Sequence, residues 1–206
     1  MTDRAPDVDP WQRRHADPTA GGPEFARLVE AVRRLQDAVV QIAAPEEQSG
    51  RAADAVEDVA AELEKWPASE WERSAGRRSD LPGRGHPLLL PVLVDERAGT
   101  TLRGRVTFGP YYLGGNGAAH GGALPLLFDE VLGMLVNSVE SGAPRRTAYL
   151  TVNYRAITPV GTELRLTASV DRTEGRKTWA TGRLHDGDRL VADAEGLFVK
   201  LRPGQP

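Results

Sequence analysis

One short segment places a histidine, two glycines and a carboxylate where they could act together on a carbonyl group. His120-Gly121-Gly122 precedes a long apolar-periodic run, and Asp129 lies two helical turns into that run. At ~100° per residue, Gly122 and Asp129 fall on the same flank of the helix, about 10 Å apart along its axis. First-turn amides have no partner within a helix and could hold an oxyanion. A reacting carbonyl could lie between amide and carboxylate.

The neighbours of Asp129 distinguish it from an ordinary surface aspartate. Leu127, Phe128 and Leu132 surround it in sequence, so we expect them to bury it and to strengthen it as a base. Counted from Leu124 at ~100° per residue, Glu130 falls near ~240° on the same helix, opposite the apolar stripe. We expect Glu130 to be solvated and inert.

The elements that position these residues follow from the hydrophobic period. An apolar stripe at three- and four-residue steps predicts a helix over residues 121–138. Strand-like runs occupy residues 86–95, 100–108, 147–156, 162–173, 177–185 and 189–201, with the first two joined by a turn at 96–99. One helix among antiparallel strands predicts an α+β fold with the helix across one face of the sheet. The open sheet edge favours pairing with a second copy.

The first part of the chain has a different character. Residues 1–23 lack an apolar period and are expected to be a flexible tail, and residues 24–73 carry two helical patterns, the first over about 23–44 and the second opening at Pro45. A Gly-, Arg- and Pro-rich stretch over 74–85 is typical of a linker. We therefore divide the chain into tail, helical extension, linker and a domain over 86–202.

Composition excludes several classes of function. The 206 residues hold 26 basic and 29 acidic side chains, a net charge of −3, which offers no general attraction for nucleic acid. Cysteine is absent, so disulfides, thiol catalysis and thiolate metal sites are excluded. No apolar run approaches the ~18 residues of a membrane span, and the first residues do not have the layout of a secretory signal. We expect a cytoplasmic protein with no metal and no resident cofactor.

The motif resembles that of a known family. His120-Gly121-Gly122 with Asp129, followed by Thr147-Ala-Tyr-Leu-Thr-Val-Asn153-Tyr154-Arg155, is similar to the hotdog-fold acyl-CoA thioesterases, particularly the phenylacetate-pathway (PaaI) type. The resemblance covers about residues 86–202. It implies a sheet wrapped around one long helix, a homodimer or homotetramer, and a coenzyme A or carrier-protein thioester as substrate.

The resemblance also implies catalytic roles. Asp129 would be the nucleophile or general base, and Gly122 would offer its N–H to the thioester oxygen. His120 would polarise the carbonyl, and Thr147 would orient the attacking water, acting on the Asp129 of the other chain. Asn116 stands where some members carry a site asparagine.

Further residues are candidates for binding the substrate. Arg176 and Lys177 resemble the hairpin that meets the phosphates of coenzyme A in this family, although an ordinary polar turn explains them equally well. The remaining candidates flank the motif or lie on the strand that follows it: Gly121, Phe128, Asn153, Tyr154 and Arg155.

Three functions are compatible with these residues. The leading hypothesis is a hydrolase of acyl-CoA or acyl-carrier-protein thioesters. The second is a non-catalytic acyl-thioester binder that uses its N-terminal helices to engage a partner, and the presence of both Asp129 and Thr147 favours hydrolysis over it. The order of the motif disfavours the third, a hotdog dehydratase or hydratase.

Overall fold

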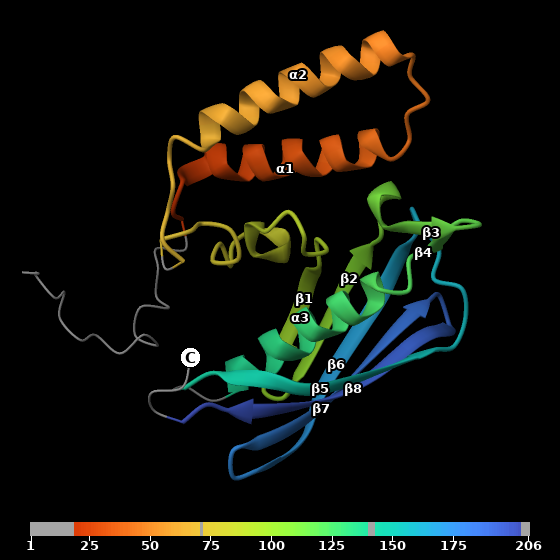
Figure 1. Cartoon of the computed structure of the whole chain (residues 1–206). Coiled ribbons are helices and arrows are strands. Elements are labelled where there is room, and N and C mark those ends of the chain that lie inside the picture. Colours follow the sequence, from red (N-terminus) through yellow and green to blue (C-terminus); the bar gives the residue numbers. More distant parts are fainter. Residues whose placement is uncertain (1–18, 71, 140–142, 203–206) are drawn as a thin grey trace, which may run out of the picture.

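The C-terminal part of the chain is an antiparallel sheet with one long helix across a face (Figure 1). The structure is a computed structural model that describes residues 19–70, 72–139 and 143–202. Residues 1–18 of the predicted tail lie outside these ranges. Six strands pair in the order β1-β2-β6-β7-β8-β5. They are β1 (Leu93–Ala98), β2 (Thr101–Thr107), β5 (Arg145–Tyr154), β6 (Glu163–Glu174), β7 (Lys177–Asp186) and β8 (Arg189–Lys200).

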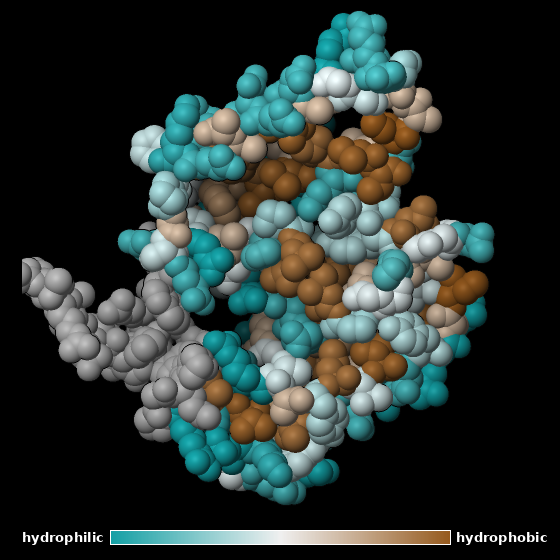
Figure 2. Space-filling model, viewed as in Figure 1, coloured by the Kyte–Doolittle hydropathy of each residue, from teal (hydrophilic) through white to brown (hydrophobic). Residues whose placement is uncertain are grey.

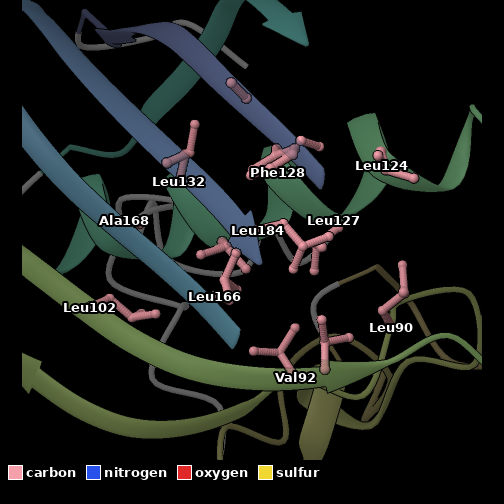
Figure 3. Packing of buried hydrophobic residues seen from close by; sticks show 14 of the residues in the cluster. Leu90, Val92, Leu102, Leu124, Leu127, Phe128, Leu132, Leu166, Ala168 and Leu184 are labelled. Atoms are coloured by element: carbon pink, nitrogen blue, oxygen red, sulfur yellow. The ribbon is translucent and has the colours of Figure 1, made fainter. Parts of the chain in front are cut away.

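Helix α3 (Ala123–Val139) supplies much of the core. Its buried residues, which include Leu124, Leu127, Phe128 and Leu132, meet the inward residues of the sheet (Figure 3). Along β2 burial alternates at every residue, so Leu102 and Val106 face the helix while their neighbours face solvent. The α+β prediction with a sheet wrapped around one helix is confirmed. The helix starts two residues later than expected, within the usual uncertainty of helix ends.

The first predicted strand differs from the structure. Residues 86–92 are irregular, and the strand begins only at Leu93. Pro87 and Pro91 lack the N–H that a strand ladder needs, although Leu90 and Val92 are buried like strand residues. The turn also lies later than residues 96–99, because Ala98 already pairs with Thr101. Buried coil and buried strand produce the same short apolar run.

A small hairpin precedes the predicted motif and was not anticipated as an element. Strands β3 (Leu113–Gly115) and β4 (Ala118–Ala119) pair around Asn116 and Gly117, whose φ values are 51° and 74°. Two left-handed residues in a two-residue turn define type I′, for which Asn-Gly is the preferred sequence. The conformation of the turn therefore accounts for Asn116.

The N-terminal helices differ in how they contact the sheet domain. Helix α1 (Gly22–Val39) buries Val29, and Asp37 Oδ1 accepts a hydrogen bond of 2.9 Å from the Tyr111 amide. Helix α2 (Glu46–Leu63) has no buried residue. Figure 2 shows apolar side chains gathered along α1 and α2. Exposed apolar residues of these two helices include Val39, Val56 and Val59. Of these two helices, α1 is the one with a buried residue and a hydrogen bond to the domain.

The segment over residues 74–85 is packed against its neighbours. It ends in a short helix, η2 (Pro82–Gly85), and contains the buried Arg78. The guanidinium of Arg78 bonds Asp80 and donates to the carbonyl oxygen of Gly22, at the start of α1. Arg33 of α1 donates at 2.9 Å to the carbonyl of Pro82. These bonds fix the segment against α1.

Close contact between α3 and β7 leads to a stability prediction. A Cβ atom built on Gly182 would lie 2.9 Å from Cδ1 of the buried Phe128 ring. We expect Gly182→Ala to lower the free energy of unfolding by about 1–3 kcal/mol, because the ring must move in a filled core. Urea unfolding measures this change. The matched control is Gly50→Ala in α2, where an added Cβ meets nothing within 4 Å. A Gly182→Ala protein that unfolded at the wild-type midpoint would contradict the close packing.

Candidate active site

Asp129 and Thr147 form the centre of the candidate site. Asp129 projects from α3, and Thr147 lies on β5 opposite Phe198 of β8, whose side chain is in the core beneath the helix. Because paired strand residues share a face, Thr147 also points toward α3. Its hydroxyl donates to Asp129 Oδ1 at 2.7 Å. The pair therefore forms within one chain, whereas the family resemblance had implied that Thr147 acts on the other chain's aspartate.

Asp129 is exposed, contrary to expectation. Its apolar neighbours Leu127, Phe128 and Leu132 all turn toward the sheet, so they fill the core and leave the carboxylate uncovered. The prediction that these neighbours bury Asp129 is wrong. Within a single chain, Thr147 is the group that holds the carboxylate.

His120 and Gly122 contact each other at the start of α3. The Gly122 N–H donates to His120 Nδ1 at 3.0 Å, so this amide is already engaged by the imidazole. An amide N–H can only donate, so Nδ1 accepts and a neutral ring carries its proton on Nε2. The His120 amide in turn donates to the carbonyl of Tyr112 at 2.6 Å. These bonds give the imidazole a defined orientation with Nε2–H as its donor.

Gly121 and Tyr154 connect the start of the helix to the end of β5. The Tyr154 hydroxyl donates to the Gly121 carbonyl at 2.9 Å. Tyr154 also lines a cavity of about 300 Å³ together with Leu124 and Ile157. Tyr154, predicted as a substrate-binding residue, thus contacts the motif at Gly121.

Three other candidates have structural partners. Phe128 is fully buried against Gly182, which leaves it no access to the surface. Asn153 donates a hydrogen bond of 2.7 Å to Asp193, and Arg155 donates one of 2.5 Å to the same carboxylate. These bonds link β5 and the residue after it to β8. The Arg155 hydrogen bond is the main reason that the pKa of Asp193 lies below its usual value, with a smaller contribution from Asn153. This cluster explains Asn153 and Arg155 without a ligand.

Glu130 is neither solvated nor isolated, which corrects the expectation from the helical wheel. Its side chain is only 14% exposed. Arg84 of η2 contacts both carboxylate oxygens, with Nε at 2.6 Å and Nη2 at 2.7 Å. The 74–85 segment therefore lies against the outer face of α3 at Glu130, and the ion pair fastens the segment there.

A cleft of about 860 Å³ opens at Asp129 and Thr147. The 74–85 segment and the outer face of α3 contribute to its lining, and so does the start of β5. Arg176 and Lys177 lie in the β6–β7 turn at the same end of the sheet, where Arg176 donates to the Lys200 carbonyl at 3.0 Å. Lys177 pairs with Val199, which on its other side pairs with Arg146.

Comparisons with known proteins relate part of the chain to thioesterases. Residues 116–192 match the family described as the thioesterase superfamily. The acyl-coenzyme A thioesterase THEM4 of Xenopus laevis is 34% identical over 97 residues, which are 46% of this chain and 43% of that protein. The chain thus spans less than half the length of this relative.

Solved structures extend the similarity to most of the chain. A thioesterase superfamily protein superposes with a TM-score of 0.74 at 29% identity, covering 85% of this chain and 90% of that one. A phenylacetic acid degradation-related protein of Ralstonia eutropha gives a TM-score of 0.50 at 25% identity, covering 53% of this chain and 85% of that one. The sheet and α3 therefore have the hotdog fold, and within them residues 116–192 match the thioesterase superfamily.

Proposed function

We propose that this protein is a thioester hydrolase that cleaves an acyl-coenzyme A into a free acid and coenzyme A. The observation that carries the proposal is the Asp129–Thr147 hydrogen bond of 2.7 Å at the mouth of a large cleft, within the region that matches the thioesterase superfamily. The relative named as an acyl-coenzyme A thioesterase supports the substrate class.

Asp129, Thr147 and His120 can take separate roles in the reaction. Thr147 engages Asp129 Oδ1, so Oδ2 is the oxygen that takes a proton from water as the water oxygen attacks the thioester carbon. Negative charge then develops on the former carbonyl oxygen, which His120 Nε2–H would stabilise. The carbon–sulfur bond breaks, and the departing thiolate takes up a proton. In the alternative route Asp129 attacks the carbon directly and water hydrolyses the resulting anhydride.

A second copy of the chain would complete the site. Among the described strands, β5 is the last in the sheet and pairs with β8 alone, so its other edge is open next to Thr147. Exposed apolar residues lie on or just after this edge, among them Tyr149, Tyr154 and Ile157. Pairing of two β5 edges would cover these residues and shield the site from bulk solvent. This favours a homodimer, or a tetramer built from dimers.

Release of free thiol from coenzyme A thioesters of graded acyl length tests the proposal. We expect hydrolysis of at least one of them, with kcat lowered at least ~100-fold in the Asp129→Asn variant. Binding of acyl-CoA without thiol release would favour the non-catalytic binder, and activity confined to acyl-carrier-protein thioesters would identify the carrier instead. No helix among the described residues is long and apolar enough to cross a membrane. The cytoplasmic location and the phenylacetate-pathway subtype stay predictions.

Recognition of the coenzyme A end of the substrate leads to a second kinetic prediction. Replacing Arg176 and Lys177 with alanine should raise KM for acyl-CoA with little change in kcat, because phosphate contacts act about equally in ground and transition states. The effect should shrink with salt, since exposed charges are screened within about 10 Å at 0.1 M. Thioesters of N-acetylcysteamine lack the phosphates and serve as the control. Equal losses on both substrates would indicate structural damage instead.

A further inference from the structure

The cleft beside Asp129 is strongly basic, although the whole chain carries a net charge of −3. Its lining includes six arginines and three acidic residues. The arginines are Arg73, Arg77, Arg84, Arg97, Arg145 and Arg146, and the acids are Glu70, Asp129 and Glu130. Because basic side chains outnumber acidic ones in this lining, the cleft should attract anions more than the rest of the surface does.

Several of these arginines are already engaged by the protein, among them Arg77, which donates to the Glu70 carbonyl at 3.3 Å. Arg84 neutralises Glu130 in the ion pair described above, and the buried Arg145 donates to Thr178 at 2.9 Å. Arg73 and Arg97 are both exposed and come from different elements of the cleft lining, and Arg73 Nε donates one long hydrogen bond of 3.5 Å to the Glu70 carbonyl. Arg73 belongs to the stretch that leads into the 74–85 segment, and Arg97 to the end of β1.

The electrostatics of a neighbouring histidine agree with a positive potential here. Burial is the main reason that the pKa of His86 lies below its usual value, and the nearby charges of Arg84 and Arg73 lower it further. Glu130 opposes this shift but does not reverse it. Positive charge from this wall therefore extends into the packed segment.

We propose that the cleft binds an anionic group of the thioester substrate, a carboxylate or a phosphate, and that Arg73 and Arg97 determine this specificity. The inference rests on the proposed function, because it uses the position of Asp129 as the point of reaction. Both arginines precede residues 116–192, the part that matches the thioesterase superfamily. The carboxylate would be at the far end of the acyl group, and the phosphate would belong to coenzyme A.

Four substrates separate the two sources of negative charge. Glutaryl and pentanoyl groups have the same number of carbons, but only glutaryl ends in a carboxylate. Each is presented on coenzyme A and on pantetheine, which lacks the phosphates. We expect Arg73→Ala/Arg97→Ala to raise KM at least about tenfold, or ~1.4 kcal/mol, for the substrates whose anion occupies the cleft, with kcat nearly unchanged. The double lysine variant should retain most of the affinity.

The pattern of losses identifies the anion. Losses on both glutaryl substrates, but not on pentanoyl-pantetheine, assign the cleft to the acyl carboxylate. Losses on both coenzyme A substrates, but not on pentanoyl-pantetheine, assign it to the carrier phosphates. The matched control is Arg27→Ala/Arg51→Ala, which removes two exposed arginines from the N-terminal helices. The proposal would be overturned if the double alanine variant had the wild-type KM on all four substrates. The same losses in the control variant would also overturn it.

Calorimetric binding distinguishes failure of the cleft from failure of the proposed function. Free coenzyme A and glutarate are the probes, and pantetheine is the uncharged reference. Binding of either anion to the wild-type chain, weakened about tenfold in the double alanine variant, would support the cleft even if no thioester were hydrolysed. If neither anion binds at low salt, the cleft has no such site.

Discussion

Asp129→Asn is expected to lower kcat by at least ~100-fold, a loss of about 2.7 kcal/mol of transition-state stabilisation. The substitution keeps the size of the side chain and an oxygen that can accept the 2.7 Å hydrogen bond from Thr147. It removes the negative charge and the ability to take a proton. Because Asp129 is exposed and outside the core, the fold should persist. Steady-state thiol release measures the change.

Asp58→Asn supplies the matched control. It makes the same chemical change on the exposed helix α2, remote from the cleft, and should leave kcat unchanged. Unfolding curves of both variants should overlay that of the wild type. Wild-type turnover by the Asp129→Asn protein would remove Asp129 from the mechanism, and with it the central observation of the proposed function.

Regular periodicity explains which parts of the fold could be predicted. The stripe that includes Leu124, Phe128 and Leu132 identified α3 because helical burial repeats every three or four residues. Strands β6, β7 and β8 were found within one residue of their ends, since turn residues separate them. The prediction of a strand over 86–92 was wrong, because a local apolar sequence does not show which partners the backbone N–H and C=O groups bond.

Non-local contacts explain what the sequence could not show at the site. Arg84 and Glu130 are far apart in the chain, and a helical wheel places Glu130 on the outer face of α3 without showing that the 74–85 segment contacts it there. The same limitation applies to the basic cleft, whose arginines come from separate elements. The motif itself was local and could be identified, but its internal bond between His120 and Gly122 required the backbone geometry.

Gly122→Pro is expected to reduce kcat about as severely as Asp129→Asn, by ~100-fold, because proline deletes the amide donor. Proline is tolerated at the start of a helix, and glycine before it relieves the steric restriction. The Gly122 carbonyl remains available to Leu126, which it contacts at 3.5 Å. The helix should therefore form, while the bond to His120 Nδ1 is lost.

Gly122→Ala separates loss of the donor from crowding. Its Cβ would lie 3.2 Å from His120 Nδ1, so the ring must shift slightly, but the amide remains. We expect a loss of only a few-fold for this variant. An equal loss in the alanine and proline variants would show that crowding, and not the missing donor, causes the defect.

A double-mutant cycle with His120→Ala then decides how the Gly122 amide acts. If the amide works by orienting the imidazole, Gly122→Pro adds nothing once His120 is absent, and the coupling energy equals the whole effect of the proline, about 2.7 kcal/mol. If the amide contacts the thioester oxygen directly, the proline slows the His120→Ala enzyme further. The observed bond of 3.0 Å favours the first result, because a single N–H already donated to Nδ1 has little left for a second acceptor. Nearly additive losses would return the oxyanion site to the Gly122 amide.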